Sequence, residues 1–229
     1  MRQGGSGLPP EPETGTRVVM TGRPLFWDVD TQHDFMRATG KLYVGDSEAI
    51  IPTLAALTAY AHDRGIRIVA SADDHDTGHR ELSHTPDFAE SFPEHCMRGT
   101  PGQRKIPETT LLNPMVLEPD LPIPAGVRGH QGDFLLHKHW FDVFTSPHVV
   151  PLLQILEPTD IVLYGVALDV CNRFAIEGLL LHRPLARIHL VTDATRAIRP
   201  ENSAALLKDW ERRGVKLVTA ADVLSGRVV

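Results

Sequence analysis

The chain has 229 residues, of which 42% are hydrophobic, so it is long enough to bury one sizeable core. Its formal charge is -6, from 23 Lys and Arg against 29 Asp and Glu, which gives no general attraction to nucleic acid or to anionic lipid. No apolar run approaches the roughly 20 residues of a membrane span. Only two cysteines, Cys96 and Cys171, are present, which excludes a disulfide-stapled secreted scaffold. We therefore expect a cytoplasmic protein that binds neither nucleic acid nor membranes.

The first residues differ in composition from the rest of the chain. They are rich in Gly, Pro and Glu, and no apolar segment of the kind found in secretory signals follows Arg2. We expect residues 1–20 to form a flexible N-terminal arm and residues 21–229 to form a single domain.

From residue 23 onward, short apolar runs alternate with longer amphipathic ones, which is typical of strands joined by crossover helices. Between residue 73 and about residue 132 the pattern is too irregular for regular structure, and a loop of this length is usually functional or disordered. The pattern predicts a three-layer α/β/α fold with a mostly parallel sheet of about six strands. The predicted strands are 24–30, 66–72, 134–138, 160–167, 188–192 and 215–219, and the predicted helices are 46–65, 147–157, a segment around 171–181, and 200–213.

Reactive side chains stand at the ends of the predicted strands. Asp30, Asp73 and Lys138 each close a strand, and Cys171 comes shortly after the strand that ends at Ala167. In open parallel sheets, ligands bind in the crevice beyond the carboxyl ends of the strands. The positions of these four residues therefore predict a site at this edge.

Cys171 falls in the first turn of a predicted helix, where unpaired N–H groups lower the pKa of a thiol and favour the thiolate. Lys138 offers a neighbouring ammonium, and Asp30 offers a base to take and return a proton. Taken singly, the same residues are compatible with a buried small side chain, a surface lysine and a turn cap.

Three motifs carry a resemblance. Asp30-Thr-Gln-His-Asp-Phe35, His137-Lys138 and Gly165-Val-Ala-Leu-Asp-Val-Cys171 resemble the catalytic motifs of the isochorismatase-like cysteine hydrolases, in order and in spacing. The loop Phe92-Pro-Glu-His-Cys-Met-Arg-Gly-Thr-Pro-Gly102 is similar to that of the nicotinamidases within this superfamily. The resemblance covers residues 23 to 223 and implies a Rossmann-like hydrolase fold.

The resemblance implies that Asp30, Lys138 and Cys171 form a catalytic triad. It further implies an oxyanion hole made by the backbone N–H groups of Ala167 and Cys171, with a cis peptide before Ala167. The chain departs from the family pattern at Leu168, where Thr is frequent, and at Asn172, where Val is frequent. Both departures affect the expected substrate more than the chemistry.

A metal site is the second expectation. Asp73 and His75 are two residues apart and can face one side of an extended segment, and His95 supplies a further ligand. Two imidazoles and a carboxylate suit Zn, alternatively Mn or Fe, and the set resembles the nicotinamidase metal site. The fourth ligand is open: Glu81 has the expected offset, and His79 and His84 lie close by. The competing interpretation is a solvated His-rich loop.

The implied reaction is the hydrolysis of a small amide to an acid and ammonia through a cysteine thioester. Nicotinamide, cleaved to nicotinate in NAD salvage, is the leading substrate, and Phe35, Phe92 and Trp140 are candidates for the walls of its pocket. The alternatives are a related amidohydrolase acting on a carbamoyl or maleamic-type amide, or a non-catalytic protein that binds a small ligand. Relatives of this kind form homo-oligomers, so we expect a dimer or tetramer.

Overall fold

The computed structural model describes residues 22–229, so the expected arm over residues 1–20 lies outside the described residues. A seven-stranded sheet with the order β3-β4-β2-β1-β5-β6-β7 lies at its centre, and all neighbouring strands are parallel. The strands are β1 (Pro24–Val29), β2 (Arg67–Asp73), β3 (Met115–Leu117), β4 (Phe134–Lys138), β5 (Asp160–Val166), β6 (Arg187–Arg196) and β7 (Lys216–Val218).

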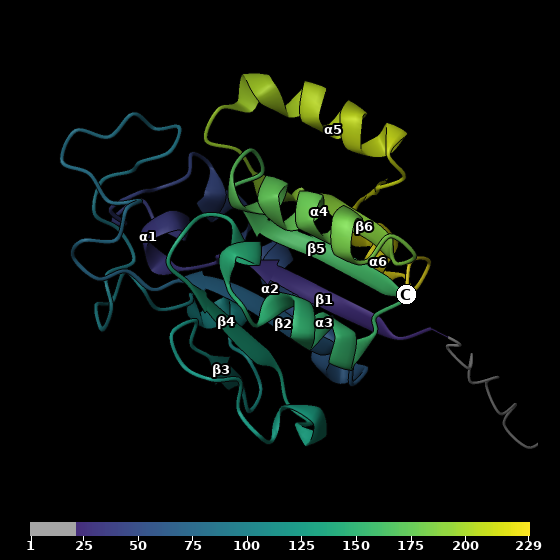
Figure 1. The fold of residues 1–229 in the computed structure, drawn as a ribbon. Coiled ribbons are helices and arrows are strands. Elements are labelled where there is room, and N and C mark those ends of the chain that lie inside the picture. Colours follow the sequence, from purple (N-terminus) through teal and green to yellow (C-terminus); the bar gives the residue numbers. More distant parts are fainter. Residues whose placement is uncertain (1–21) are drawn as a thin grey trace, which may run out of the picture.

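Helices cover both faces of the sheet (Figure 1), as the alternating pattern predicts. One face carries α3, α4 and α5, and the other carries α2 and α6. Among the helices in residues 22–229, none combines the length and the apolar character that crossing a membrane requires. The helices are α1 (His33–Met36), α2 (Ile51–Asp63), α3 (Val149–Leu156), α4 (Cys171–His182), α5 (Ser203–Arg212) and α6 (Ala220–Leu224), with short 3-10 turns at Ser47–Ile50, Pro107–Thr109, Val127–Gly129, Val143–Thr145 and Pro200–Asn202.

The core consists of two apolar layers, one on each face of the sheet. Phe26 and Trp27, neighbours on β1, point to opposite faces, and both are fully buried. A parallel sheet covered on both faces is expected to have strands that are apolar throughout, and β5 is buried along its whole length. The three-layer α/β/α prediction is confirmed.

The sheet has seven strands where the sequence predicts about six. The additional strand, β3, has only three residues and lies within the long irregular segment, so its pattern is too short to recognise. The helices α1 and α6 are likewise too short for the sequence pattern to predict them. β6 extends beyond the predicted end at Thr192 to Arg196, past an irregularity in its pairing with β5.

The carboxyl ends of the strands meet at one edge of the sheet, where the loops after β1 and β2 gather with α1 (Figure 1). The register of β2 and β4 makes Asp73 and Lys138 direct neighbours on adjacent strands. β1 lies between β2 and β5, so its last residue is close to both. The strand order therefore brings the predicted site residues together.

One packing contact of α4 is unusually close and can be tested. A Gly→Ala change inside a helix normally stabilises by about 0.5–1 kcal/mol. At Gly178 the added methyl would overlap the ring of Phe144. We predict that Gly178→Ala lowers the free energy of unfolding by about 1–3 kcal/mol, the usual cost of overpacking. Urea unfolding measures this, and the cost should shrink when Phe144→Leu is introduced as well; an equal cost in both backgrounds would contradict the contact.

Candidate active site and metal centre

The predicted triad residues come together beyond the strand ends. The Lys138 ammonium lies 3.0 Å from the Asp30 carboxylate and 3.9 Å from the Cys171 sulfur. It also contacts the Asp73 carboxylate. All four side chains are buried; Cys171, the most exposed, is 8% accessible. A single buried cation therefore lies between two carboxylates and a thiol.

Asp30 is held in place by its backbone and by its neighbours. It has a left-handed backbone conformation with φ of 49°, which is uncommon for a residue other than glycine and clusters at functional sites. Its carboxylate accepts a hydrogen bond of 2.6 Å from the Ser71 hydroxyl, and its N–H donates to the Ser71 carbonyl at 3.2 Å. Sequence reasoning missed Ser71, although it lies on β2 two residues before Asp73.

Burial dominates the electrostatics of the triad. It raises the pKa of Asp30, and the nearby Lys138 ammonium offsets only part of this effect. Burial would lower the pKa of Lys138, but Asp30 and Asp73 outweigh it and hold the pKa well above its usual value. Lys138 is thus a permanent cation.

The state of the nucleophile differs from the expectation of a favoured thiolate. Burial raises the pKa of the Cys171 thiol well above its usual value; Lys138 lowers it, while Asp30 and Asp73 raise it further. The position at the start of α4 does not overcome this, because the thiol is removed from water and faces two carboxylates. Cys171 therefore rests as a thiol, which needs a base to ionise it.

The resemblance predicts an oxyanion hole in the backbone before α4, and the backbone there has two unusual features. The peptide bond between Val166 and Ala167 is cis. The Ala167 carbonyl accepts hydrogen bonds from the N–H groups of Val170 and Asn172, at 3.1 and 3.0 Å. Within residues 22–229, the N–H groups of Ala167 and Cys171 donate to no protein acceptor. Both N–H groups are thus available to an oxyanion.

Asn172, a departure from the family pattern, has a clear structural role. Its side-chain amide donates to the Gly165 carbonyl at 3.1 Å and to the Thr195 hydroxyl at 2.8 Å. It is fully buried. The substitution therefore ties the start of α4 to β5 and β6 and leaves the triad untouched.

Four buried side chains converge beside the triad and fit a metal ion. One ligand atom from each of Asp73, His75, Glu81 and His95 lies within 4.8 Å of the others. The Nε2 atom of His95 is 3.5 Å from both the Asp73 and Glu81 oxygens. Each of the four has a buried oxygen or nitrogen without a hydrogen-bond partner. Buried polar atoms are rarely left unpaired, and these are the donor types that Zn, Mn and Fe bind.

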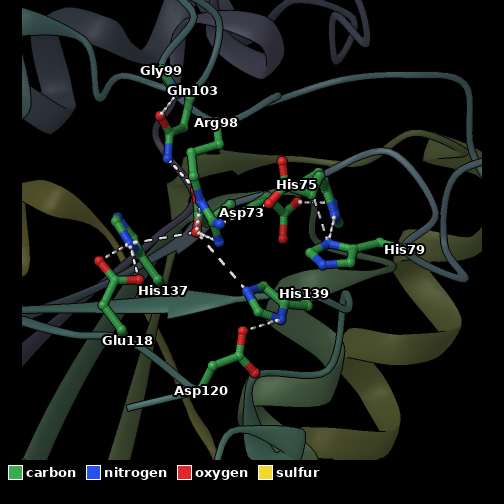
Figure 2. Close-up of polar contacts among 12 residues, drawn as sticks. Asp73, His75, His79, Arg98, Gly99, Gln103, Glu118, Asp120, His137 and His139 are labelled. Carbon is green, nitrogen blue, oxygen red and sulfur yellow. Dashed lines mark hydrogen bonds and ion pairs between the residues drawn. The ribbon is translucent and has the colours of Figure 1, made fainter.

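Neighbouring groups orient the two imidazoles. The Nδ1 of His95 lies 2.7 Å from the Pro93 carbonyl, so Nδ1 donates to that carbonyl and Nε2 is the ring nitrogen that faces the cluster. The Nδ1 of His75 lies 3.4 Å from the Nδ1 of His79, which accepts from the Asp76 N–H at 3.2 Å. Figure 2 shows His79 beside His75. His79 thus contacts the Nδ1 side of the candidate ligand His75. His84 is exposed and is not one of the four clustered side chains.

The cluster favours a positive charge. Burial would lower the pKa of His95, but the Asp73 and Glu81 carboxylates beside it raise the pKa to about 10, so Nε2 holds a proton that a metal ion would have to displace. Burial would raise the pKa of Asp73, yet Lys138 and the two imidazoles hold it well below its usual range. Burial lowers the pKa of His75 to about 3, which keeps this imidazole neutral, as a metal ligand must be.

A second group of acids and histidines lies close by but is already paired. Asp74 accepts hydrogen bonds from Arg98 at 2.9 Å and from Gln103 at 2.5 Å. Figure 2 shows the side chains of Arg98 and Gln103 next to each other. His137 lies 2.9 Å from both oxygens of Glu118. This network joins the ends of β2 and β4 to the long loop.

A small pocket opens onto Cys171 and onto three of the candidate metal ligands, Asp73, Glu81 and His95. Phe35 and Phe92 line it, as the resemblance implies. Trp140 does not line it, because its ring packs against Phe141 and beneath the Arg80 guanidinium. Phe141 takes the wall position instead, and sequence reasoning missed it although it directly follows Trp140. Apolar residues that the sequence did not indicate complete the wall: Leu42, Val44, Val166, Val170 and Ile198.

Three known proteins similar to this chain in sequence carry nicotinamidase descriptions. No family model matches the chain. The chain is 27% identical over 198 residues to the nicotinamidase/pyrazinamidase of Mycobacterium tuberculosis, covering 84% of this chain and 97% of that protein. It is 24% identical to the nicotinamidase of Escherichia coli, covering 85% and 93%. It is also 26% identical to an Arabidopsis thaliana protein described as a probable inactive nicotinamidase, covering 83% and 89%.

Solved structures share the fold. The pyrazinamidase of Pyrococcus horikoshii in complex with zinc has a TM-score of 0.67 at 23% identity, covering 86% of this chain and 99% of that one. A protein from L. infantum in complex with nicotinate has a TM-score of 0.68 at 19% identity, covering 89% and 96%. An isochorismatase family protein from Desulfovibrio vulgaris reaches 0.67 at 20% identity, covering 88% and 96%. The fold is therefore that of the isochorismatase-like hydrolases. In sequence, the chain is similar to two nicotinamidases.

The buried cation generates a stability prediction. Removing one partner of a buried ion pair leaves an uncompensated charge and costs about 3–5 kcal/mol. Lys138→Met should therefore lower the free energy of unfolding by about that amount at pH 7, because Asp30 and Asp73 lose their shared counter-charge. Urea unfolding followed by circular dichroism measures the loss. Lys41→Met, at an exposed pair 3.9 Å from Glu94, is the control and should change little; equal effects would contradict the central role of Lys138.

Proposed function

We propose that the chain is an amidohydrolase that cleaves a small amide to an acid and ammonia through a thioester on Cys171, with nicotinamide as the leading substrate. The observation that carries the proposal is the position of Lys138, which reaches Asp30 and Cys171 at 3.0 and 3.9 Å beside a buried ligand cluster. Similarity in sequence to two nicotinamidases supports the choice of substrate.

The first half of the reaction forms the thioester. Asp30 takes the proton of the Cys171 thiol, a step favoured by its raised pKa, which makes it a stronger base than an exposed carboxylate. The thiolate attacks the amide carbonyl, and the N–H groups of Ala167 and Cys171 stabilise the oxyanion. Lys138 compensates the negative charge of whichever partner is ionised. Protonated Asp30 then donates to the leaving nitrogen, and ammonia departs.

The second half releases the acid. Asp30, again a carboxylate, removes a proton from water, which attacks the thioester carbonyl at the same oxyanion hole. When the tetrahedral intermediate collapses, Cys171 leaves and recovers its proton from Asp30. The overall change is amide plus water to acid plus ammonia.

The four ligand residues have a separate role. Asp73, His75, Glu81 and His95 would hold a divalent ion, Zn or alternatively Mn or Fe, which supplies a Lewis acid that orients a substrate nitrogen or a water. Because the pocket walls include Asp73 and His95, a substrate beside Cys171 also lies beside these ligands. The nucleophile remains Cys171.

A non-catalytic protein of the same fold is the competing function, because one relative is described as probably inactive. The assembled triad argues against this function, because a protein that only binds a small ligand does not need an acid, a base and a nucleophile side by side. A third candidate function is that of an amidase for another small amide, which would use the same thioester chemistry. The N-carbamoylsarcosine amidase of Thermoplasma acidophilum shares the fold, with a TM-score of 0.64 at 21% identity.

Ammonia release from nicotinamide tests the reaction. Purified metal-replete protein should release ammonia, and Cys171→Ala should reduce the rate by a factor of about 10³ or more, because removal of a nucleophile abolishes the covalent route. Cys96→Ala, at the other buried cysteine, should keep the activity. A fully active Cys171→Ala variant would refute the thioester. If the wild-type chain is inactive on nicotinamide but hydrolyses another small amide, only the proposed substrate changes. If it hydrolyses no amide in a broad panel, the non-catalytic binding protein becomes the better proposal.

Metal content tests the ligand set. We expect one divalent ion per chain by elemental analysis, lost in His75→Ala, which removes a ligand nitrogen, and bound more weakly in Glu81→Gln, which removes the negative charge of the carboxylate. The exposed His84 supplies the control, and His84→Ala should retain the ion. Unchanged affinity in Glu81→Gln would withdraw Glu81 as a ligand, and a metal-free enzyme with full activity would refute the site.

A further inference from the structure

The segment after β1 carries three buried polar side chains at alternate positions: Asp30, Gln32 and Asp34. They are 0%, 0% and 4% exposed. Asp30 belongs to the triad. The other two have no part in the proposed reaction steps, and buried polar side chains of this kind usually have specific partners.

Gln32 binds both backbone groups of Asp73. Its side-chain oxygen accepts from the Asp73 N–H at 2.7 Å, and its side-chain nitrogen donates to the Asp73 carbonyl at 2.8 Å. The second proton of the same nitrogen goes to the Gln103 carbonyl at 2.6 Å. A carboxamide combines a donor and an acceptor in one planar group, which a carboxylate or an apolar side chain does not. The backbone of Asp73 is therefore fixed by one side chain at both peptide groups.

Asp34 acts in the same way next to His95. Its carboxylate accepts from the Cys96 N–H at 2.8 Å and from the Lys41 N–H at 3.1 Å. Gly102 packs directly against this carboxylate, where any larger side chain would overlap it. The residue that follows His95 is thus anchored to the segment after β1.

The two anchored residues carry the metal-facing atoms that lie 3.5 Å apart, the carboxylate of Asp73 and the Nε2 of His95. They come from distant parts of the chain, one at the end of β2 and one in the long loop. Gln32 binds the backbone of Asp73, and Asp34 binds the N–H of Cys96, the residue directly after His95. A metal site needs its ligands held to within a fraction of an ångström, and outer partners of ligands supply that precision.

We propose that Gln32 and Asp34 are positioning residues that hold Asp73 and His95 in register for the metal ion. The inference rests on the metal site of the proposed function. It assigns to the first motif a second task beside its catalytic carboxylate: the same segment that supplies the base also sets the spacing of two metal ligands.

The test is zinc affinity, measured by calorimetric titration of Zn²⁺ into the metal-stripped full-length chain. Gln32→Glu, which keeps the acceptor and loses the donor, and Asp34→Asn should each weaken Zn²⁺ binding by about 10- to 100-fold, the usual effect of losing an outer partner. Gln32→Met, which removes donor and acceptor at similar size, should weaken binding at least as much. If one variant fails to fold, the others still report.

Asp133 provides a matched control for general destabilisation. Its buried carboxylate accepts from the Ile68 N–H at 2.8 Å and the Leu112 N–H at 2.7 Å, so it anchors the start of β2 as Gln32 anchors its end. Asp133→Asn should lower the melting temperature and leave Zn²⁺ affinity as in wild type.

Zn²⁺ affinity within about twofold of wild type in the folded Gln32 and Asp34 variants would overturn the proposal, and so would an equal loss in Asp133→Asn. A wild-type chain that binds no Zn²⁺ would overturn it together with the metal site. A wild-type chain that binds Zn²⁺ but hydrolyses no amide would refute the proposed reaction alone, because the titration involves no catalysis.

Discussion

The site depends on one buried charge, the Lys138 ammonium. It is 1% exposed and lies between the carboxylates of Asp30 and Asp73. In a medium of low dielectric, an uncompensated charge of either sign is costly, so these three groups stabilise one another only when all are present. The parallel register that makes Asp73 and Lys138 neighbours on β2 and β4 is thus the structural origin of the site.

Asp73 connects the two parts of this site. One of its oxygens contacts Lys138, and the other lies 3.5 Å from His95 within the ligand cluster. A charge placed among the ligands therefore interacts electrostatically with the Lys138 ammonium beside Cys171. The proposed positioning of Asp73 by Gln32 extends the same chain of contacts to the segment that carries Asp30. Triad and ligand cluster form one polar unit rather than two adjacent ones.

The sequence predicts the fold from local patterns, and the resemblance names most of the residues that the structure brings together in this unit. Apolar runs mark the long strands; Asp73 and Lys138 end two of them, and Asp30 directly follows a third. Contacts across the long loop are not local, so no pattern distinguishes Phe141 from Trp140 as the pocket wall or reveals the backbone contacts of Gln32. The state of Cys171 differs from the prediction for a similar reason: a helix start favours a thiolate, but burial beside two carboxylates raises the pKa of the thiol.

If this polar unit makes Cys171 a nucleophile, a thioester forms on Cys171 during the reaction. Detection of this acyl-enzyme is the most direct test of the proposed function. The wild-type chain should be mixed with nicotinamide, quenched in acid within one turnover, and analysed by intact and peptide mass spectrometry. The account predicts a mass increase equal to the acyl group, located on the peptide that contains Cys171 and absent when the substrate is omitted. Ammonia release at full rate with an unmodified Cys171 at every quench time would contradict the account.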